Sequence, residues 1–214
     1  MILNDISLSL QQGKAKEVRL LVQNAILQGI LACDILDNGL ITGMQIIGAK
    51  FKRNEVFVPE VLIAARAMNA GLEILRPILV SSGVKFIGKA LICTVKGDLH
   101  DIGKNLVKMM FEGQGIECID LGVDVESETI LQAVRDHSPD ILCLSALLAT
   151  TMVEQKEVIL ALEKAGLRSQ VKVLVGGAPV NLEYANEIHA DGYAPDAASA
   201  AELARALLLQ RSSR

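Results

Sequence analysis

The feature that most constrains the fold is an alternation of strand and helix patterns, repeated five times from residue 89 onward. Short apolar runs between turn residues predict strands, and longer segments with apolar residues at helical spacing predict helices. The predicted strands are 89–95, 116–120, 140–145, 171–175 and 191–193. The predicted helices are 102–113, 126–137, 152–165, 181–189 and 197–209. This alternation predicts an α/β fold with a Rossmann-like, five-stranded parallel sheet of flavodoxin-like order 2-1-3-4-5.

The first 80 residues have a different pattern, with helical periodicity and no strand signal. One segment begins with Pro59, at a position where proline favours the start of a helix. Its apolar residues share one face: Val61, Ala65, Met68, Leu72, Leu75 and Leu79. Further helices are predicted over 4–10, 14–28 and 31–52, so we expect a small four-helix bundle.

Turn-forming residues between the two patterns indicate a linker: Pro77, Ser81, Ser82, Gly83 and Gly88. We therefore expect a helical-bundle domain over residues 1–84 and a Rossmann-like domain over residues 85–214. Three glycines, Gly39, Gly43 and Gly48, would weaken the third predicted helix by roughly 1 kcal/mol each if they were exposed. Their presence predicts close helix packing or a bound ligand at that helix.

A histidine stands at the first junction of strand and helix, where residues 95–104 read Val-Lys-Gly-Asp-Leu-His-Asp-Ile-Gly-Lys. His100 thus follows a parallel strand, at the edge where open α/β sheets bind their ligands. Asp98 is close enough to form a hydrogen bond with the imidazole, a pairing typical of metal-binding histidines. We predict a metal-ligating histidine; the alternative is a loop histidine that only caps the helix.

Two further loops follow strands of the same predicted sheet. Ser145-Ala-Leu147 comes after the third strand, and Gly176-Gly177 comes after the fourth. In the predicted order the first and third strands are neighbours, which places His100 and Ser145 on either side of one crevice. The three loops therefore predict one extended ligand site.

The motifs D-x-H-x-x-G, S-x-L and G-G at these spacings resemble the cobalamin-binding domain of methionine synthase. The chain is most similar to the small corrinoid proteins of methyltransferase systems in methanogens and acetogens. The segments that carry the resemblance are 97–105, SALLATTM at 145–152, GGAPV at 176–180, ADGYAPDA at 190–197 and FKRNEVFVPE at 51–60.

The resemblance implies a role for each of these segments. His100 would be the lower axial ligand of cobalt, Asp98 would bind its imidazole, and the Thr151 hydroxyl would complete the relay. Ser145, Leu147, Gly176, Gly177, Tyr193, Ala194 and Ala197 would border a slot for the nucleotide tail of the cofactor. The predicted cofactor-binding set also contains Gly97, Leu99, Asp101, Ile102, Gly103 and Thr150.

In the helical domain, the resemblance implies that Asp37, Phe51 and Val58 lie over the upper, methyl-carrying face of the corrinoid. Apolar residues at helical spacing usually belong to a core, so bundle packing is an equally weighted reading of Phe51 and Val58. His137 and His189 have no motif around them, and we expect surface or capping residues.

The function implied by the resemblance is that of a corrinoid methyl carrier in one-carbon metabolism. Cobalt would accept a methyl group from a substrate-specific methyltransferase, and the methylated cofactor would be the intermediate that serves a second methyltransferase. The acceptor side would use tetrahydrofolate or a thiol, and a reductive activase would be a third partner. On its own the chain would be a non-catalytic carrier. The alternatives are a cobalamin-dependent sensor or a mutase subunit.

Composition limits the other function classes. The net charge is −4 and no long basic run occurs, which argues against nucleic acid as a partner. No apolar stretch of about 18 residues and no signal pattern is found, so we expect a cytoplasmic protein that does not enter a membrane. The four cysteines share no C-x-x-C spacing, and we expect small buried residues rather than disulfides or a zinc site.

Overall fold

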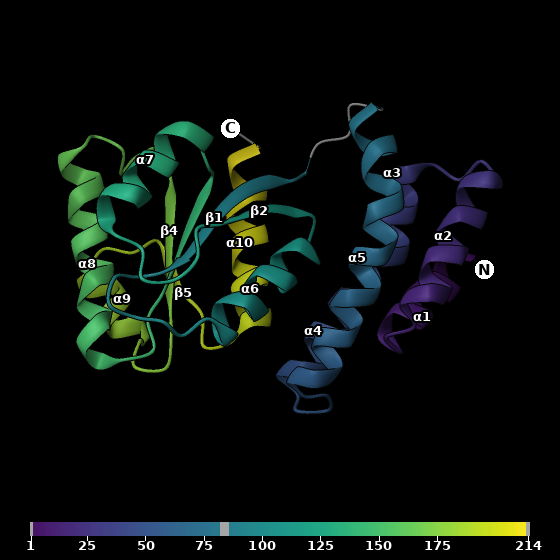
Figure 1. The fold of residues 1–214 in the computed structure, drawn as a ribbon, viewed down its shortest axis with the longest axis horizontal. Coiled ribbons are helices and arrows are strands. Elements are labelled where there is room, and N and C mark those ends of the chain that lie inside the picture. Colours follow the sequence, from purple (N-terminus) through teal and green to yellow (C-terminus); the bar gives the residue numbers. More distant parts are fainter. Residues whose placement is uncertain (1, 82–85, 213–214) are drawn as a thin grey trace. The chain divides into compact units, whose positions relative to one another are not determined.

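The computed structural model describes residues 2–81 and 86–212 and divides into two compact units (Figure 1). The helical unit comprises Met1–Phe86 with Gly113–Gly115, and the α/β unit comprises Ile87–Glu112 with Ile116–Arg214. The domain boundary predicted between residues 84 and 85 lies outside the described residues. Among the described helices, none combines the length and the apolar character that crossing a membrane requires.

The helical unit contains the four helical segments that the periodicity predicts. They are α1 (Ile2–Gln11), α2 (Ala15–Leu27), a third segment made of α3 (Ala32–Ile35), η1 (Leu36–Ile41) and α4 (Thr42–Lys52), and α5 (Val58–Ser81). The predicted apolar face of α5 is buried throughout, from Val61 to Leu79. The core of this unit is therefore an apolar interior between helices, with α2 packed along α5.

The third helix differs from the prediction because it is not a regular α-helix. Its middle part, η1, is a π-helix, and the Thr42 hydroxyl donates a hydrogen bond to the carbonyl oxygen of Asp37 at 2.9 Å. Gly39 and Gly43 lie against α1: an added Cβ would be 3.1 Å from the Ile6 side chain or from the Ser7 carbonyl oxygen. The prediction of close helix packing at these two glycines is confirmed.

Three of the predicted linker markers are wrong, because Pro77 and Ser81 belong to α5 and Gly88 belongs to β1. Pro77 is within α5, which continues to Ser81 because Leu75 and Leu79 on either side of it are buried. That packing outweighs the backbone hydrogen bond that proline cannot form. Gly88 begins β1, where a Cβ would lie 2.4 Å from the Leu208 side chain.

The α/β unit has the predicted parallel sheet, with strand order β2-β1-β3-β4-β5. The strands are β1 (Gly88–Thr94), β2 (Ile116–Asp120), β3 (Ile141–Ser145), β4 (Lys172–Gly176) and β5 (Gly192–Tyr193). The helices are α6 (Ile102–Glu112), α7 (Ser127–His137), α8 (Ala149–Lys164), α9 (Leu182–Glu187) and α10 (Ala197–Ser212). α8 begins three residues earlier than the prediction of 152.

Helices cover both faces of this sheet, with α7, α8 and α9 on one face and α6 and α10 on the other (Figure 1). Every second residue of the central strands enters one apolar cluster with α7, α8 and α9; examples are Leu91, Leu142 and Val173. Cys93 and Cys143 are buried in β1 and β3, while Cys33 and Cys118 are partly buried, and all four are free thiols.

Candidate functional site

The register of the sheet brings the three predicted loops to one edge. Thr94, the last residue of β1, is paired with Ser145 of β3, and Ser145 is paired with Gly176 of β4. The histidine loop, which we define as residues 95–101, therefore lies beside the loop that begins at Ala146. The predicted adjacency of His100 and Ser145 across neighbouring strand ends is confirmed.

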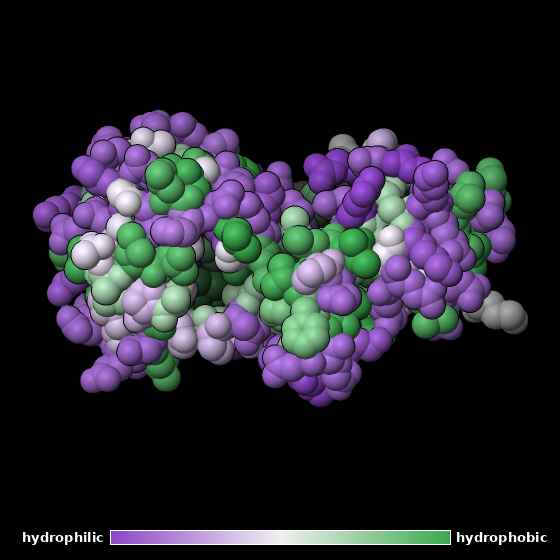
Figure 2. All heavy atoms as spheres, turned by 60° about the horizontal axis from the view of Figure 1, so that its bottom comes forward, coloured by the Kyte–Doolittle hydropathy of each residue, from purple (hydrophilic) through white to green (hydrophobic). Residues whose placement is uncertain are grey.

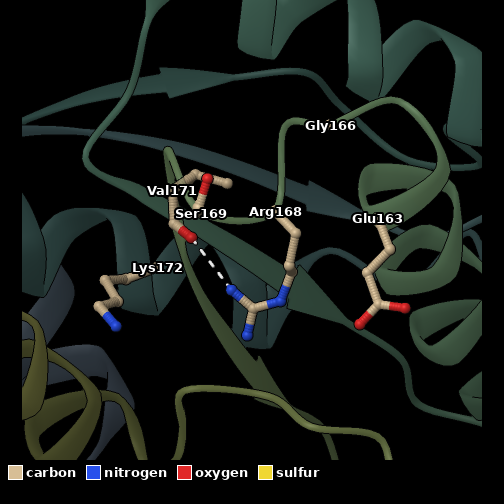
Figure 3. Close-up of a pocket in the computed structure, with 6 residues that line it drawn as sticks. All are labelled: Glu163, Gly166, Arg168, Ser169, Val171 and Lys172. Carbon is tan, nitrogen blue, oxygen red and sulfur yellow. Dashed lines mark hydrogen bonds between the residues drawn. The ribbon is translucent and has the colours of Figure 1, made fainter.

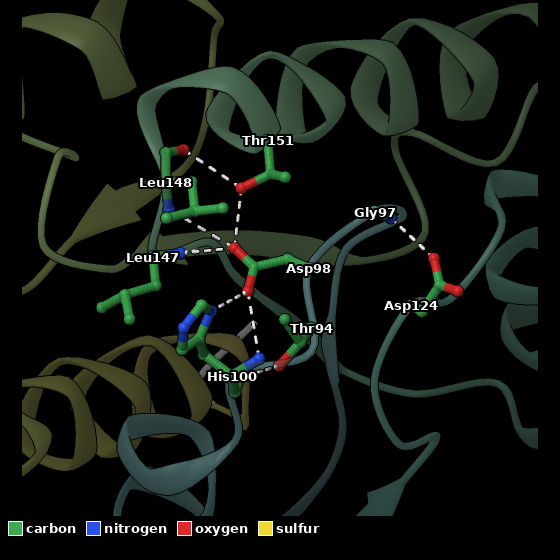
Figure 4. Close-up of polar contacts among 8 residues, drawn as sticks. All are labelled: Thr94, Gly97, Asp98, His100, Asp124, Leu147, Leu148 and Thr151. Carbon is green, nitrogen blue, oxygen red and sulfur yellow. Dashed lines mark hydrogen bonds and ion pairs between the residues drawn. The ribbon is translucent and has the colours of Figure 1, made fainter.

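His100 is exposed, and only one of its ring nitrogens is bound within the protein (Figure 4). Its Nδ1 lies 2.7 Å from Asp98 Oδ1, and about half of its side-chain surface is accessible to solvent. In the part of the chain that the structure describes, no hydrogen bond to Nε2 is formed. With the proton on Nδ1 donated to the carboxylate, the lone pair of Nε2 is available to a metal.

Asp98 is fully buried, and its second carboxylate oxygen is held by the loop after β3. Oδ2 accepts hydrogen bonds from Thr151 Oγ1 at 2.6 Å and from the Leu147 amide at 2.7 Å (Figure 4). Burial raises the pKa of Asp98, but the hydrogen bonds from Thr151, Leu147 and His100 outweigh it and hold the pKa well below its usual range. Asp98 is thus a carboxylate that fixes the imidazole on one side and two residues of another loop on the other.

The surroundings of His100 are apolar and open. Leu99 and Ile102 are 70% and 76% exposed, and Leu147 and Leu148 are each 43% exposed. A Cβ at Gly103 would meet nothing within 4 Å. Exposed apolar side chains gathered around a polar group are typical of a ligand-binding surface.

Among the described residues, no group of three or more His, Cys, Asp or Glu side chains could hold an ion, whereas zinc sites use three or four. A single histidine on an apolar surface suits a metal ion whose other ligands come from a large and largely apolar organic ring. The residues present therefore fit a metal-containing macrocycle.

The predicted tail slot is bordered by small or partly buried residues. Ser145, Gly176, Tyr193 and Ala194 are partly buried, and Ala197 is buried at the start of α10. A Cβ at Gly176 would meet only the Ala194 carbonyl oxygen, at 3.9 Å. A side-chain carbon at position 176 would therefore make only an ordinary van der Waals contact.

Gly177 is required by the close approach of two loops of the protein. Its φ is +129°, and an added Cβ would lie 1.7 Å from the carbonyl oxygen of Ala146. Glycine, which has no Cβ, allows this approach.

Comparison with known families decides the nature of this site. Residues 88–202 match a family model described as "B12 binding domain", and residues 2–76 match a second model with the same description. The chain belongs to the B12-binding corrinoid proteins. Its cofactor is therefore cobalamin or a related corrinoid.

Individual relatives cover nearly the whole corrinoid protein. A corrinoid protein of Desulfitobacterium hafniense is 39% identical over 210 residues, which is 97% of each chain. A trimethylamine corrinoid protein of Methanosarcina acetivorans is 39% identical over 189 residues, covering 87% of this chain and 88% of the relative.

Solved structures show the same fold. A chain of the methanol:cobalamin methyltransferase complex from Methanosarcina barkeri has a TM-score of 0.84 and is 32% identical, over 97% of this chain and 80% of that one. A cobalamin-binding protein from Desulfitobacterium hafniense has a TM-score of 0.81 and is 28% identical, over 96% and 98%.

The three residues predicted in the helical unit are at or near its surface. Asp37 is exposed within η1, and Phe51 and Val58 are partly exposed at the end of α4 and the start of α5. Neither Phe51 nor Val58 belongs to the buried core of the described residues. Apolar surface is visible on this unit in Figure 2, and the exposed side chains include Phe57, Leu62 and Ile63.

Two further predicted residues lie at the starts of two helices, α6 and α8. Asp101 is exposed before α6 and accepts a hydrogen bond from the Asn105 side chain at 3.0 Å, and Thr150 is exposed in the first turn of α8. His137, the last residue of α7, and His189, just after α9, are exposed, as predicted for surface positions.

Sequence reasoning missed three residues that hold the strand ends and loops at this edge of the sheet. The buried Thr94 donates a hydrogen bond from Oγ1 to the His100 carbonyl oxygen at 2.8 Å. Asp124 accepts one from the Gly97 amide, and the buried Gln155 side chain donates to carbonyl oxygens of Leu144 and Gly176. None of them belongs to a motif, so only their long-range contacts reveal them.

A surface cavity at the opposite edge of the sheet is unrelated to this site (Figure 3). It lies beside the first residue of β4 and is lined by Glu163, Gly166, Arg168, Ser169, Val171 and Lys172. Its two basic side chains both pair with Asp191, at 2.8 Å from Arg168 and 2.7 Å from Lys172. The charges at this edge thus stabilise the start of β4.

Proposed function

We propose that this corrinoid protein carries a methyl group from a substrate-specific methyltransferase to a second methyltransferase, whose acceptor is tetrahydrofolate or a thiol. The cobalt of the bound corrinoid would supply the methyl-accepting and methyl-donating chemistry. A reductive activase would restore the cofactor after accidental oxidation. The observation that carries the proposal is the exposed Nε2 of His100, backed by a buried carboxylate and surrounded by exposed apolar side chains.

The names of the relatives support the methyltransferase partner. One relative is a trimethylamine corrinoid protein, and one solved structure is a methanol:cobalamin methyltransferase complex. By analogy, the donor of the first methyl group would be a small methylated compound such as a methylamine or methanol, chosen by the partner enzyme.

In this proposal His100 would hold the cobalt of the corrinoid through Nε2. Asp98 would orient the ring and, because its pKa is low, would remain a carboxylate that increases electron density on the imidazole. The Thr151 hydroxyl and the Leu147 amide hold Asp98 in place. Ser145, Gly176, Ala194 and Ala197 would border a slot for the nucleotide tail, and Asp37, Phe51 and Val58 would shield the bound methyl group.

Electron paramagnetic resonance tests the cobalt ligand. The protein is loaded with hydroxocobalamin and reduced to the cobalt(II) state, with ordinary or isotopically labelled histidine. We expect nitrogen splitting that changes with the label and disappears in His100→Ala. The matched control is His137→Ala, which removes another exposed histidine of the same unit and should retain the splitting. Unchanged splitting in His100→Ala would contradict the assignment.

The carrier role needs a separate measurement. The loaded and reduced protein is mixed with methanol or methylamine methyltransferases and a methyl-labelled substrate, and the label bound to the protein is counted. Transfer from at least one enzyme is expected. If no enzyme transfers label while corrinoid binding is normal, the carrier role is wrong and only the binding role remains.

A further inference from the structure

The loop between β2 and α7 holds the histidine loop through its main chain. We define residues 121–126 as the clamp loop. The Thr94 amide donates to the Gly122 carbonyl oxygen at 3.0 Å, and the Val125 amide donates to the Thr94 carbonyl oxygen at 3.1 Å. The Asp124 amide donates to the Asp98 carbonyl oxygen at 2.9 Å. The clamp loop therefore contacts the chain on both sides of the turn that leads to His100.

One side chain of the clamp loop adds a fourth contact. The Gly97 amide donates a hydrogen bond to Asp124 Oδ1 at 2.6 Å (Figure 4). A hydrogen bond from an amide to a carboxylate is stronger than one between neutral groups. We propose that Asp124 is a positioning residue for the cobalt ligand, because its carboxylate fixes the Lys96–Gly97 peptide and its amide fixes the Asp98–Leu99 peptide of the loop that presents His100. The inference rests on the proposed role of His100.

The conformation of the turn explains why such a contact matters. Gly97 has a φ of +76°, and the Asp98 amide donates to the Val95 carbonyl oxygen at 3.2 Å, which makes a tight turn. Glycine adopts positive and negative φ about equally readily in the unfolded chain. An external acceptor for the Gly97 amide selects one orientation of the Lys96–Gly97 peptide, and the turn in that orientation leads to Asp98, which is buried.

The two sides of Asp98 are thus held by different loops. Its carboxylate is bound by Leu147 and Thr151 of the loop and helix after β3, and its main chain is bound by Asp124. Asp98 Oδ1 in turn holds both the amide and the ring of His100. A change in the Lys96–Gly97 peptide would therefore change the direction of the imidazole through Asp98.

Asp124 does not act as a cap of the following helix. The N-terminal cap position of α7 is Glu126, and no side chain caps that helix end. Asp124 itself has a φ of +52°, a left-handed conformation that aspartate, asparagine and glycine accept best. Asparagine and glycine are therefore the two replacements that keep the backbone of the clamp loop.

The first measurement uses corrinoid-free protein. Asp124→Gly removes the acceptor, and Asp124→Asn keeps an acceptor oxygen at the same place. We expect hydrogen exchange of the Gly97 amide to increase about 10-fold in Asp124→Gly, as for the loss of one charge-assisted hydrogen bond. Asp124→Asn should change it little. Ser138→Gly is the matched control, because it loosens another left-handed residue, at the end of α7, and should leave Gly97 unaffected.

The second measurement uses protein loaded with hydroxocobalamin. We expect Asp124→Gly to bind it about 10-fold more weakly and to show histidine splitting in only part of the cobalt(II) signal. Asp124→Asn and Ser138→Gly should resemble the wild type. Far-ultraviolet circular dichroism verifies that each variant is folded; Asp124 is exposed, so its replacement leaves the core intact.

The outcomes separate this inference from the proposed function. If the wild type shows histidine splitting and Asp124→Gly retains the full splitting and affinity, the positioning role is wrong while the ligand role of His100 stands. If Asp124→Asn is as defective as Asp124→Gly, the hydrogen bond is not the cause and the inference is overturned. If the wild type shows no histidine splitting, the positioning role of Asp124 and the ligand role of His100 are both contradicted, whatever the exchange rate of the Gly97 amide.

Discussion

In the α/β unit Asp98 is fully buried and accepts hydrogen bonds from the loop and the helix that follow β3, whereas in the helical unit Asp37 is exposed. Asp98 and His100 are thus held by polar contacts within the protein. Phe51 and Val58 are only partly buried. The α/β unit therefore fixes the direction of one side chain, whereas the helical unit presents partly exposed apolar residues.

The largest expected effect is that of Gly177→Ala on the stability of the α/β unit. The new Cβ would collide with the Ala146 carbonyl oxygen, and a φ of +129° strains alanine. We expect a loss on the order of 3 kcal/mol in the free energy of unfolding. Both tyrosines, Tyr184 and Tyr193, lie in this unit and tryptophan is absent, so tyrosine emission during urea unfolding follows it alone.

Gly103→Ala is the control for adding a methyl group at the same sheet edge. Its Cβ would meet no atom within 4 Å, so stability should change by less than about 1 kcal/mol. Affinity for hydroxocobalamin should nevertheless decrease, because the proposed ligand occupies that space. Equal stability losses in the two variants would show that steric contact with Ala146 is not the cause.

The next largest effect is expected at Asp98 of the α/β unit and should be absent at Asp37 of the helical unit. Asp98→Ala leaves the Thr151 hydroxyl and the Leu147 amide without their acceptor, so we expect a loss of about 1–3 kcal/mol in stability. Corrinoid affinity should decrease by about 10–100-fold, as for other partners of metal-binding histidines. Asp37→Ala should change stability by less than about 0.5 kcal/mol, because that residue is exposed. Thermal unfolding in a calorimeter measures the stability, and calorimetric titration with hydroxocobalamin measures the affinity. Similar stability losses in Asp98→Ala and Asp37→Ala would contradict the prediction.

Acid should affect the two units differently. In the α/β unit, burial raises the pKa values of Asp98, Asp120 and Asp191, but hydrogen bonds and ion pairs outweigh it and lower all three. A carboxyl group whose pKa is lower in the folded state stabilises that state above its unfolded pKa, which is about 4. This stabilisation is lost as the pH falls through and below that value.

The helical unit has a lowered carboxyl pKa at Glu55, through its hydrogen bond with Arg53, but that pair is exposed. We therefore expect tyrosine emission to report unfolding of the α/β unit below about pH 4. The helical circular dichroism signal should decrease only in part over that range. Coincident transitions of the two signals would show that the units do not differ in acid sensitivity.

The smallest expected effect concerns the helical unit. If Phe51 shields a bound methyl group, Phe51→Ala should increase its loss to light or thiols a few-fold. Phe57→Ala, at a neighbouring position that is 61% exposed, is the control and should change that loss less. Lower thermal stability of Phe51→Ala with unchanged methyl loss would favour the packing role instead.

Much of the fold could be predicted because its signals are local. Apolar periodicity marked the strands and helices, and the handedness of crossovers led to the order β2-β1-β3-β4-β5. The contact of Asp98 with His100 could also be predicted, since the two residues are two positions apart. The role of Thr151 came from the resemblance alone. Pro77 and the π-helix could not be predicted, because packing within the bundle overrides the local preference at those positions.

The pattern of residues is sufficient to identify the segments that become strands and the polar residues at their carboxyl ends. Which of those residues come into contact depends on the folded chain. The Asp98 carboxylate accepts a hydrogen bond from Thr151, which is 53 residues away in the sequence. The Gly97 amide donates one to Asp124, which is 27 residues away. These hydrogen bonds depend on the register of neighbouring strands and on left-handed loop residues. No local sequence pattern predicts these two hydrogen bonds, because each contact exists only after the sheet has formed.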